Sequence, residues 1–370
     1  MPSNIDVPIT SLSASTYVIP TDGPEADGTF AWDSTTMVVV EARAGDQTGT
    51  GWTYAPRAAA VVIEDTLTDI VIGRDAGAIT AIYEEACRAV RNQGRGGIAA
   101  CAISAVDLAL WDLLARLHDE PLHRFLGRVH RDVAVYGSGG FTTYDDRRLD
   151  EQLTYWVDTE GFSSVKIKIG ESWGANVTRD LARMRQVRGR IGPDRELFVD
   201  GNGAYGVSQA IGVLMRCEDA AVSWFEEPVS SDDLEGLRSV RHAVTADVAA
   251  GEYGWDLWTL RRLCSSGAVD CLQADATRCG GITGWRRAAT IAAAYGLEIS
   301  GHTSPHAHAH VASATVNVRH LEWFHDHARI EERFFDGSLS PSGGRVNPDD
   351  ERIGNGYTFR SSDAAHFLVQ

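Results

Sequence analysis

From residue 132 onward, eight short apolar runs alternate with helical patterns, and this alternation restricts the fold more than any other feature of the sequence. Between the runs, apolar residues recur at three- and four-residue spacing, as they do on one face of a helix. Strands that alternate with helices form a parallel sheet, and eight such units close into a (β/α)8 barrel. The expected strands are 132–136, 165–169, 197–200, 221–226, 248–252, 269–275, 297–302 and 321–324, and the expected helices include 176–190, 207–217, 257–265, 282–295 and 309–318.

The alternative to a closed barrel is an open, doubly wound sheet. In its dinucleotide-binding form, that fold carries a G-x-G-x-x-G turn after the first strand. No such turn follows residues 132–136. The predicted fold class is therefore α/β, with a TIM-type (β/α)8 barrel.

The N-terminal part of the chain shows a different order of elements. Strand-like runs at 37–42 and 49–54, the second entered through a glycine-containing turn, precede helical patterns at 76–91 and 99–118. Strands followed by helices indicate a separate α+β domain.

We therefore expect two domains, an α+β domain over residues 1–128 and a barrel over residues 129–339. The tail 340–370, rich in Gly, Pro and Asp, is expected to pack back on the first domain. Residues 20–33 form a polar segment interrupted by Gly and Pro, which predicts a loop of the length of a lid.

Charge and composition exclude several classes of partner. With 34 Lys and Arg against 51 Asp and Glu, the net charge is −17, so we expect neither nucleic acid nor a membrane surface as a partner. No apolar run approaches the ~20 residues of a membrane-spanning helix. The first residues lack the basic and apolar segments of a signal peptide, and the six cysteines have no C-x-x-C spacing. These features predict a soluble cytoplasmic protein without a disulfide framework or a zinc ribbon.

The chain contains 32 arginines but only two lysines, Lys166 and Lys168. A GC-rich genome replaces lysine by arginine wherever a solvated charge is sufficient, so the two lysines that remain mark positions where arginine cannot serve. Arginine keeps its proton at physiological pH, whereas a buried lysine can lose it and act as a base.

An ionisable residue closes most of the expected barrel strands. Successive members of this set are separated by 20 to 32 residues, which fits one βα unit of ~30 residues at each step. All of them should therefore lie at the carboxyl-terminal mouth of the barrel and face a common site. The set consists of Lys168, Asp200, Glu226, Glu252, Asp275, His302 and Glu322.

Three of these groups, Asp200, Glu226 and Glu252, come from consecutive strands. Their mutual repulsion would protonate at least one of them unless a cation were shared between them. A set of ligands that contains only oxygen favours Mg²⁺, with Mn²⁺ as a possible substitute. On one side of this predicted metal site lie the two lysines, which share a strand face. On the other side lies His302, whose tautomer Asp275 could fix.

Several motifs together resemble the mandelate racemase/muconate lactonizing enzyme branch of the enolase superfamily. The motifs of the barrel are VKIKI at 165–169, VDGN at 199–202, WFEEP at 224–228, GE at 251–252, QADATRCGGIT at 273–283 and SGH at 300–302. AVDLALWD at 105–112 and PL at 121–122 resemble the N-terminal capping domain of that family. The stretches 94–98 and 279–285 resemble, more narrowly, enzymes of sugar acids and anhydro-sugar-acid cycloisomerases.

The resemblance implies roles for the residues that match. Asp200, Glu226 and Glu252 would be metal ligands, while Lys168 and the His302–Asp275 pair would be bases on opposite faces of the substrate. Lys166 would lie near the substrate carboxylate. Glu322 would make a hydrogen bond from the last strand, and Asn202 would contact the substrate. The resemblance also implies a homo-oligomer, either a dimer or an octamer.

In this chemistry a base removes the proton alpha to a carboxylate, giving an enediolate. Mg²⁺ and the Lys166 ammonium would stabilise that dianion, while burial and a nearby cation would lower the pKa of Lys168.

We expect dehydration of a sugar acid to a 2-keto-3-deoxy acid, because the loops contain polar side chains that suit a polyol. Racemisation, epimerisation and cycloisomerisation share the first step and stay open. The expected polar side chains are Asp22, Asn202, Tyr205, Thr303, Ser304 and His306.

Three other interpretations of the same residues stay open. His306, His308 and His310 could bind zinc, although they follow the seventh strand, in an expected loop that enters a helix. Glu227 could be the ligand in place of its neighbour Glu226, or could make a structural pair. The chain could also be a catalytically silent barrel that binds a sugar acid, although a binder has no need for bases on two faces.

Overall fold

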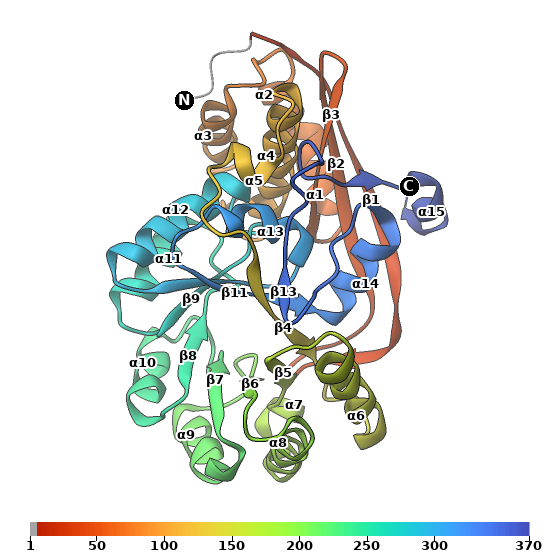
Figure 1. Cartoon of the computed structure of the whole chain (residues 1–370). Helices are drawn as coiled ribbons and strands as arrows, with labels where there is room; N and C mark the ends of the chain where they lie inside the picture. The colour runs from red at the N-terminus through yellow and green to blue at the C-terminus, as the bar shows by residue number, and fades with distance from the viewer. Residues whose placement is uncertain (1–5, 370) are drawn as a thin grey trace.

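In the computed structural model, which describes residues 6–369, eight parallel strands form a barrel below a smaller α+β unit (Figure 1). The first five residues of the predicted domain 1–128, and Gln370 of the predicted tail, lie outside the described residues. The barrel strands are β4 (Val133–Gly139), β5 (Ser164–Lys168), β6 (Glu196–Asp200), β7 (Val222–Glu226), β8 (Asp247–Ala250), β9 (Cys271–Ala274), β10 (Glu298–Gly301) and β11 (Val318–Phe324).

The barrel is closed, because β11 pairs in parallel with β4 as well as with β10. Leu321 of the last strand lies opposite Val135 of the first. An open doubly wound sheet would leave these two strands as unpaired edges, so that alternative is excluded. All eight strands agree with the expected runs to within a few residues.

Alternation along the strands explains why polar residues reach the mouth of the barrel. In β5, Val165 and Ile167 point outward into the large core that the helices cover, whereas Lys166 and Lys168 point into the barrel. An inner cluster of three aromatic and two small apolar side chains fills the barrel below the site, so its interior is a packed core. The cluster consists of Tyr136, Phe198, Trp224, Ala249 and Cys271.

Helices cover the outside of the barrel. The segment predicted as a helix at 309–318 instead forms α13 from Pro305 to Ser313. Its start is fixed by Pro305, whose ring suits the first turn of a helix, and Val318 already belongs to β11. The outer helices are α6 (Asp146–Thr154), α7 (Glu171–Gly174), α8 (Val177–Ile191), α9 (Val207–Met215), α10 (Leu234–Ala243), α11 (Leu257–Ser265), α12 (Gly281–Ala294), α13 (Pro305–Ser313) and α14 (His325–Phe334).

The α+β unit, which we call the cap, consists of an antiparallel sheet and helices packed on it (Figure 1). Its main helix, α4, is long and apolar enough to cross a membrane by length and composition alone, but 89% of its most apolar stretch is buried inside the protein. It is therefore the core helix of the cap. The elements are β1 (Ile9–Ala26), β2 (Ala31–Ala44), β3 (Gln47–Tyr54), α1 (Ala58–Val62), α2 (Thr68–Val71), α3 (Ile79–Ala89), α4 (Ile98–Leu117) and α5 (Leu122–Phe125).

The predicted lid loop at residues 20–33 is wrong, because most of this segment is a β-hairpin. The ladder between β1 and β2 continues past a register shift between Pro20 and Glu25, which absorbs the residues that break regular structure. Only residues 27–30 form the turn, where Asp27 Oδ1 accepts hydrogen bonds from the backbone N–H groups of Thr29 and Phe30.

The glycine-containing turn predicted before the second strand is also wrong. Gly49 and Gly51 lie inside β3, where α4 packs directly on the strand. A Cβ atom at Gly49 would lie 2.2 Å from Ala109 O, and one at Gly51 would lie 2.3 Å from Ala105 O. Glycine is therefore required here by the close approach of a helix rather than by a turn.

The C-terminal tail contacts both parts of the molecule. β15 (Leu368–Val369) pairs with β1 of the cap, and β13 (Arg345–Val346) pairs with β4 of the barrel. Between them, β12 (Phe335–Asp336) pairs with β14 (Thr358–Phe359), followed by α15 (Ser361–Ala364). The tail thus ties the cap sheet to the barrel.

Side chains of α4 hold the first turn of barrel helix α12. Ser104 Oγ accepts a hydrogen bond of 2.8 Å from Gly280 N, and Asp107 accepts two hydrogen bonds, 2.9 Å from Thr283 N and 2.6 Å from Thr283 Oγ1. These are donors that a helix N-terminus otherwise leaves unsatisfied. The cap is therefore attached to the barrel by buried polar contacts as well as by apolar packing.

Replacing Asp107 by Ala should lower the free energy of unfolding by about 1–3 kcal/mol, because buried donors on Thr283 would lose their acceptor. Urea denaturation followed by circular dichroism measures the change. Asp65→Ala is the matched control, since Asp65 is exposed, and it should leave stability within about 0.5 kcal/mol of the parent. Equal stability of both variants would contradict this role of Asp107.

Candidate active site

The residues predicted at the strand ends converge at the mouth of the barrel. Lys168, Asp200 and Glu226 are the last residues of β5, β6 and β7, and pairing places Lys168 opposite Asp200 and Asp200 opposite Glu226. Glu252 follows β8 by two residues, and His302 directly follows β10. All five side chains are buried. These five of the seven predicted positions therefore lie together at one mouth of the barrel.

The three carboxylates predicted as metal ligands form a compact buried set. Asp200, Glu226 and Glu252 each offer a carboxylate oxygen, and these oxygens all lie within 4.8 Å of one another. One oxygen of the set, Glu252 Oε2, is buried, and its contact within the described residues is an ion pair of 3.2 Å with His302 Nε2. Burial raises the pKa of Glu226 to about 7. A divalent cation with a preference for oxygen fits this donor set, because it would balance three buried carboxylates at once.

The two lysines are ion-paired with the same carboxylates. Lys168 Nζ lies 2.5 Å from Asp200 Oδ2, and Lys166 Nζ lies 2.5 Å from Glu226 Oε1 and 2.8 Å from Glu322 Oε1. Burial alone would lower the pKa of Lys168, but the Asp200 carboxylate raises it above its ordinary value. The prediction that the pKa of Lys168 is lowered is therefore wrong. The effect of the adjacent Asp200 carboxylate is larger than the combined effects of burial and of the positive charge on Lys166.

His302 and Asp275 form the predicted pair. His302 Nδ1 lies 2.9 Å from Asp275 Oδ2, which leaves Nε2 as the ring nitrogen that faces away from Asp275, 3.2 Å from Glu252 Oε2. Burial alone would lower the pKa of His302, but Glu252 and Asp275 together raise it to about 9. Asp275 is itself fixed by hydrogen bonds from the backbone and the hydroxyl of Thr277.

A cavity of about 270 Å³ opens over these groups and is lined from both domains. Lys168 and His302 both line it, so the predicted ammonium and imidazole face one space. Asn202 also lines the cavity, and its Oδ1 is buried without a hydrogen-bond partner in residues 6–369. The lining residues are Asp27, Phe30, Trp32, Ser34, Thr35, Lys168, Asn202, Glu252, Tyr253, Arg278, His302, Thr303, Phe324 and His327.

Lys166 and Glu322 lie beneath the cavity and do not belong to its lining. Besides Lys166, Glu322 accepts hydrogen bonds from Ser138 Oγ and from Thr303 N. The structure therefore places both residues as partners of lining residues and of the carboxylate set.

Unusual backbone conformations occur at three of the strand ends. Asn202, Glu227 and Thr303 have φ values of 44°, 36° and 47°, which residues other than glycine seldom adopt. Gly251 has a φ of 139°, and a Cβ atom there would lie 2.0 Å from Gln273 O, so only glycine can precede Glu252. Strained backbone of this kind concentrates at functional sites.

Glu227, the alternative to Glu226 as a metal ligand, lies outside the groups that could bind a metal. Within residues 6–369, the metal-capable groups of three acidic, His or Cys residues are the trio above and Asp22–Glu25–His325. Glu227 belongs to neither, and no ion pair of the described chain includes it. The expected structural pair of Glu227 is therefore absent there. Burial and nearby carboxylates raise its pKa well above the ordinary range.

The three histidines proposed for zinc lie on α13, a helix rather than the expected loop, and each has its own surroundings. His306 Nδ1 lies 2.6 Å from Glu331 Oε2, and His308 Nε2 accepts a hydrogen bond from Ala276 N. His310 is buried, and burial lowers its pKa to about 3. They do not form a shared metal-capable group within the described part of the chain.

Several residues expected to make the pocket polar have other partners. Tyr205 Oη donates to Asp180, and Asp22 accepts from Arg148 and lies 3.0 Å from His325. Like these, Ser304 and His306 are not among the lining residues; of the six expected polar residues, Asn202 and Thr303 line the cavity.

Three further lining residues were not predicted from the sequence. Phe30 and Trp32 reach the cavity from the hairpin of the cap, and the segment 20–33 had indicated only a lid. Arg278 lies 3.3 Å from Asp275 Oδ2 and 3.5 Å from Glu252 Oε1. It stands inside the motif 273–283, so the motif was the signal that could have identified it.

Residues 148–364 match the family described as enolase C-terminal domain-like, and residues 24–127 match the mandelate racemase/muconate lactonizing enzyme N-terminal domain. The chain is 32% identical to D-galactarolactone cycloisomerase of Agrobacterium fabrum over 76% of this chain and 74% of that protein.

Two solved structures resemble the whole chain. A mandelate racemase/muconate lactonizing enzyme-like protein from Rubrobacter xylanophilus is 45% identical, with a TM-score of 0.93 over 98% of this chain and all of that one. L-talarate/galactarate dehydratase from Salmonella typhimurium, solved with Mg and L-lyxarohydroxamate, is 26% identical, with a TM-score of 0.90 over 100% of this chain and 95% of that one. The chain therefore belongs to the mandelate racemase/muconate lactonizing enzyme branch of the enolase superfamily.

Proposed function

We propose that the chain is a Mg²⁺-dependent enzyme that removes the proton alpha to a carboxylate, and that its main reaction is dehydration of a sugar acid to a 2-keto-3-deoxy acid. One observation carries the proposal: Lys168 and His302 line the same cavity, beside three buried carboxylates that can share a cation. An amine and an imidazole on one cavity allow one group to take a proton while the other delivers one.

Asp200, Glu226 and Glu252 would hold the metal, with Mn²⁺ as a substitute. Mg²⁺ bound there supplies positive charge that stabilises the negative charge developing on the substrate carboxylate. The chain supplies Lys166 beneath the same carboxylates, where its ammonium stays in ion pairs with Glu226 and Glu322 and limits their repulsion.

Lys168 is the proposed base for the alpha proton. Its Nζ lies at the cavity but is held by Asp200 at 2.5 Å, so it can accept a proton only after this ion pair has loosened and a proton has left. A cation bound to Asp200 would compete with Lys168 for this carboxylate and weaken the ion pair. Lys168 is therefore expected to act as a base only when a metal ion occupies the three carboxylates.

His302 is the proposed acid for the leaving hydroxyl. Asp275 holds Nδ1, so Nε2 is the atom that can give its proton to the hydroxyl at carbon 3. As the alpha C–H electrons form the new double bond between carbons 2 and 3, the C3–O bond breaks and water leaves. The resulting enol then tautomerises to the 2-keto-3-deoxy acid. Without the proton, hydroxide would be a poor leaving group.

Sugar acids are the proposed substrates for two reasons. The lining includes the polar side chains Ser34, Thr35, Asn202 and Thr303, which suit a polyol. L-talarate/galactarate dehydratase resembles the chain along its whole length.

Cycloisomerisation is the second candidate, favoured by the similarity to D-galactarolactone cycloisomerase, and it begins with the same proton abstraction. Racemisation or epimerisation would return a proton to the same carbon.

Removal of the metal should abolish turnover. In excess EDTA we expect activity to fall to background and to return on addition of Mg²⁺ or Mn²⁺. Saturating Mg²⁺ at ~100 times its dissociation constant should stabilise the parent protein by about 2.7 kcal/mol. Glu226→Gln should lose most of this stabilisation, measured by thermal unfolding, and at least ~100-fold in rate.

Glu235→Gln is the control for this experiment, since Glu235 is exposed on α10, and it should behave like the parent. Full activity in excess EDTA would refute the metal site.

Lys168 and His302 should act on opposite faces of the substrate. In D₂O, Lys168→Ala and His302→Asn should each remove alpha-proton exchange from one stereochemical face, measured by NMR of the recovered acid. Lys168→Arg should be as inactive as Lys168→Ala, because a guanidinium keeps its charge but does not give up its proton. Retention of exchange in Lys168→Arg would indicate that only the charge is needed. Loss of the same face in both variants would contradict the assignment.

The reaction itself can be tested by a screen of hexonate, pentonate and aldarate stereoisomers with Mg²⁺. A semicarbazide assay should detect a 2-keto acid from at least one of them, and His302→Asn should reduce its formation by at least ~100-fold. Alpha-proton exchange in one acid without any keto acid would replace dehydration by epimerisation. A ring-opened product with the same mass as a lactone or anhydro-sugar acid, formed without loss of water, would instead support cycloisomerisation.

A further inference from the structure

We propose that His327 is a specificity-determining residue of the candidate active site, whose Nε2–H group donates a hydrogen bond to a substrate hydroxyl beyond carbon 3. The inference rests on the proposed function in one respect, namely that the ligand is a sugar acid held by its carboxylate at the metal. It does not require the reaction to be a dehydration, because epimerisation and cycloisomerisation would present hydroxyl groups of the same kind.

His327 lies in the first turn of α14, directly after the last strand of the barrel. Its side chain is buried, with 7% exposure, yet it lines the cavity of about 270 Å³ together with Lys168 and His302. The proposed proton transfers use the other two residues and leave His327 without a role. The cavity thus contains a second imidazole that the chemistry has not accounted for.

Contacts at Nδ1 fix the tautomer of the His327 ring. Ser304 N lies 3.3 Å from Nδ1, and a backbone N–H group can only donate, so Nδ1 is the acceptor and carries no proton. Ser304 Oγ lies 3.4 Å from the same nitrogen. Burial lowers the pKa of His327 well below its ordinary value, which keeps the ring neutral. The ring proton is therefore on Nε2, which makes Nε2 a donor.

The turn that follows His302 supplies the contact at Nδ1. Thr303 and Ser304 have φ values of 47° and 39°, which residues other than glycine seldom adopt. In this turn, Thr303 N donates to Glu322 Oε2 and Ser304 N donates to His327 Nδ1. The strained backbone therefore holds two side chains of the site in place.

Nε2, in contrast, has no hydrogen-bond partner within residues 6–369, where the bonds of this ring are those at Nδ1. The fully buried polar atoms without a partner do not include Nε2, so this atom reaches the open space of the cavity. His327 therefore presents one unused donor to whatever fills the cavity.

The ring that carries this donor is held firmly. It stacks on Tyr54 of the cap, with ring centres 3.4 Å apart and planes at 11°, and it meets Phe324 edge-on at 5.0 Å. Tyr54 is itself fixed, since its Oη donates to Glu331 Oε1. A donor that is already oriented loses little freedom when a ligand binds, which favours a role in recognition.

The order of the strands places His327 across the mouth from the proposed metal site. β4 to β11 follow one another around the barrel, so three strands separate β11 from β7 on either side. β7 ends at Glu226, the middle one of the three carboxylates, and His327 follows the end of β11 by three residues. A sugar acid held at the metal by its carboxylate would therefore extend its chain toward His327.

The chemistry of the donor indicates which group it would bind. His302 is the proposed acid at carbon 3, so the carbons beyond it are left for His327. A neutral donor suits the uncharged oxygen of a hydroxyl, whereas a carboxylate is bound more strongly by a cation. A ligand without that hydroxyl would leave the buried Nε2–H group unpaired, and sites of this kind discriminate strongly against such ligands.

The test compares acids of different length by isothermal titration calorimetry of the full chain, in buffer with Mg²⁺. Galactarate and D-gluconate have hydroxyl groups beyond carbon 3, whereas glycerate ends at carbon 3. We expect at least one of the two long acids to bind to the parent. His327→Phe, which keeps a flat ring on Tyr54 but has no donor, should weaken that binding at least ~tenfold and leave glycerate binding within ~twofold.

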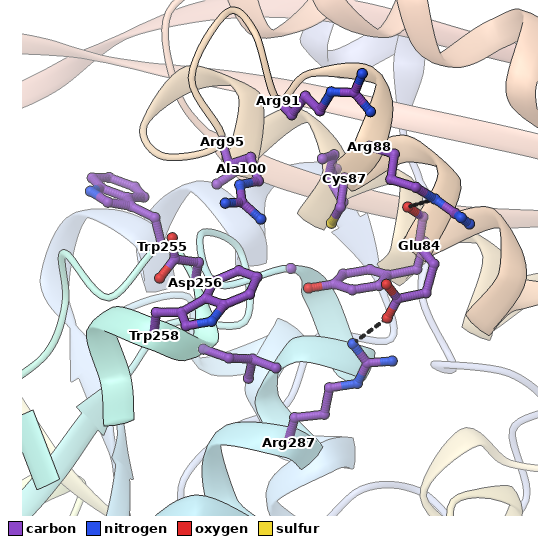
Figure 2. A pocket seen from close by; sticks show the side chains of 14 residues that line it. Glu84, Cys87, Arg88, Arg91, Arg95, Ala100, Trp255, Asp256, Trp258 and Arg287 are labelled. Carbon is purple, nitrogen blue, oxygen red and sulfur yellow. Dashed lines mark hydrogen bonds and ion pairs between the residues drawn. The ribbon is translucent and has the colours of Figure 1, made fainter. Parts of the chain in front are cut away.

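His327→Gln is the conservative variant, because its amide keeps an N–H donor, and it should retain more of the long-acid affinity than His327→Phe. His242→Gln, at an exposed histidine on α10, is the matched control. Arg91→Ala is a control for location, since Arg91 lines the separate cavity of about 340 Å³ between cap and barrel that Figure 2 shows, which shares no lining residue with the candidate active site. Both controls should bind like the parent.

The tautomer can be measured without any ligand. Long-range proton–nitrogen NMR of the protein labelled at histidine should show a neutral Nε2–H ring that is absent from His327→Gln. A charged ring or an Nδ1–H ring at His327 would overturn the proposal. This measurement needs a folded variant only for assignment, and either substitution of His327 serves.

The outcomes separate this role from the proposed function. Failure of both long acids to bind to the parent would contradict the substrate class, and with it the role of His327. Binding to the parent with unchanged affinity in a folded His327→Phe would overturn the role of His327 alone. An equal loss in His327→Phe and His327→Gln, or an equal loss for glycerate, would show that the ring only supports the wall of the cavity.

Discussion

The balance of charge at the barrel mouth is the constraint on which the rest of this structure depends. Five acidic or ammonium groups, from Lys166 to Glu322, are buried within one network of ion pairs. Separating any one of them from its partners would leave a buried charge uncompensated, which is far more costly than the ion pair is favourable. The packed inner cluster of the barrel holds these groups in place, and the cap covers them. Fold and site are therefore not separable here.

The barrel could be predicted from the sequence because its signal is local. Strands such as β5 alternate between outward apolar residues and inward ionisable ones, and each is followed by a helical pattern. The cap was predicted less well because its irregular residues are explained by tertiary contacts. Gly49 and Gly51 indicated a turn, but they make room for α4. The Gly and Pro residues at 20–24 indicated a loop, but a shift in register keeps them within a β-hairpin.

The members of the candidate site could be predicted, but their depth and their protonation could not. Spacing along the chain places a residue at the end of a strand, yet it does not say whether the side chain lines the cavity, as Lys168 does, or lies beneath it, as Lys166 does. The direction of the Lys168 pKa depends on the 2.5 Å contact with Asp200. The sequence shows that Lys168 and Asp200 are both present, but the direction of the pKa shift of Lys168 depends on the distance between the two groups.

Both domains line the cavity, and they contribute different things. The barrel carries the groups of the proposed chemistry, whereas the cap carries side chains that would contact the substrate. The groups proposed to move protons stand on or next to barrel strands, where strand pairing fixes their positions. Phe30 and Trp32, in contrast, come from the hairpin of the cap, whose turn is held by Asp27. A change in that turn would reshape the cavity while leaving the ion pairs at the strand ends intact. Because a barrel can keep its strand ends while its covering segments vary, one proton-abstracting centre can serve acids of different shape.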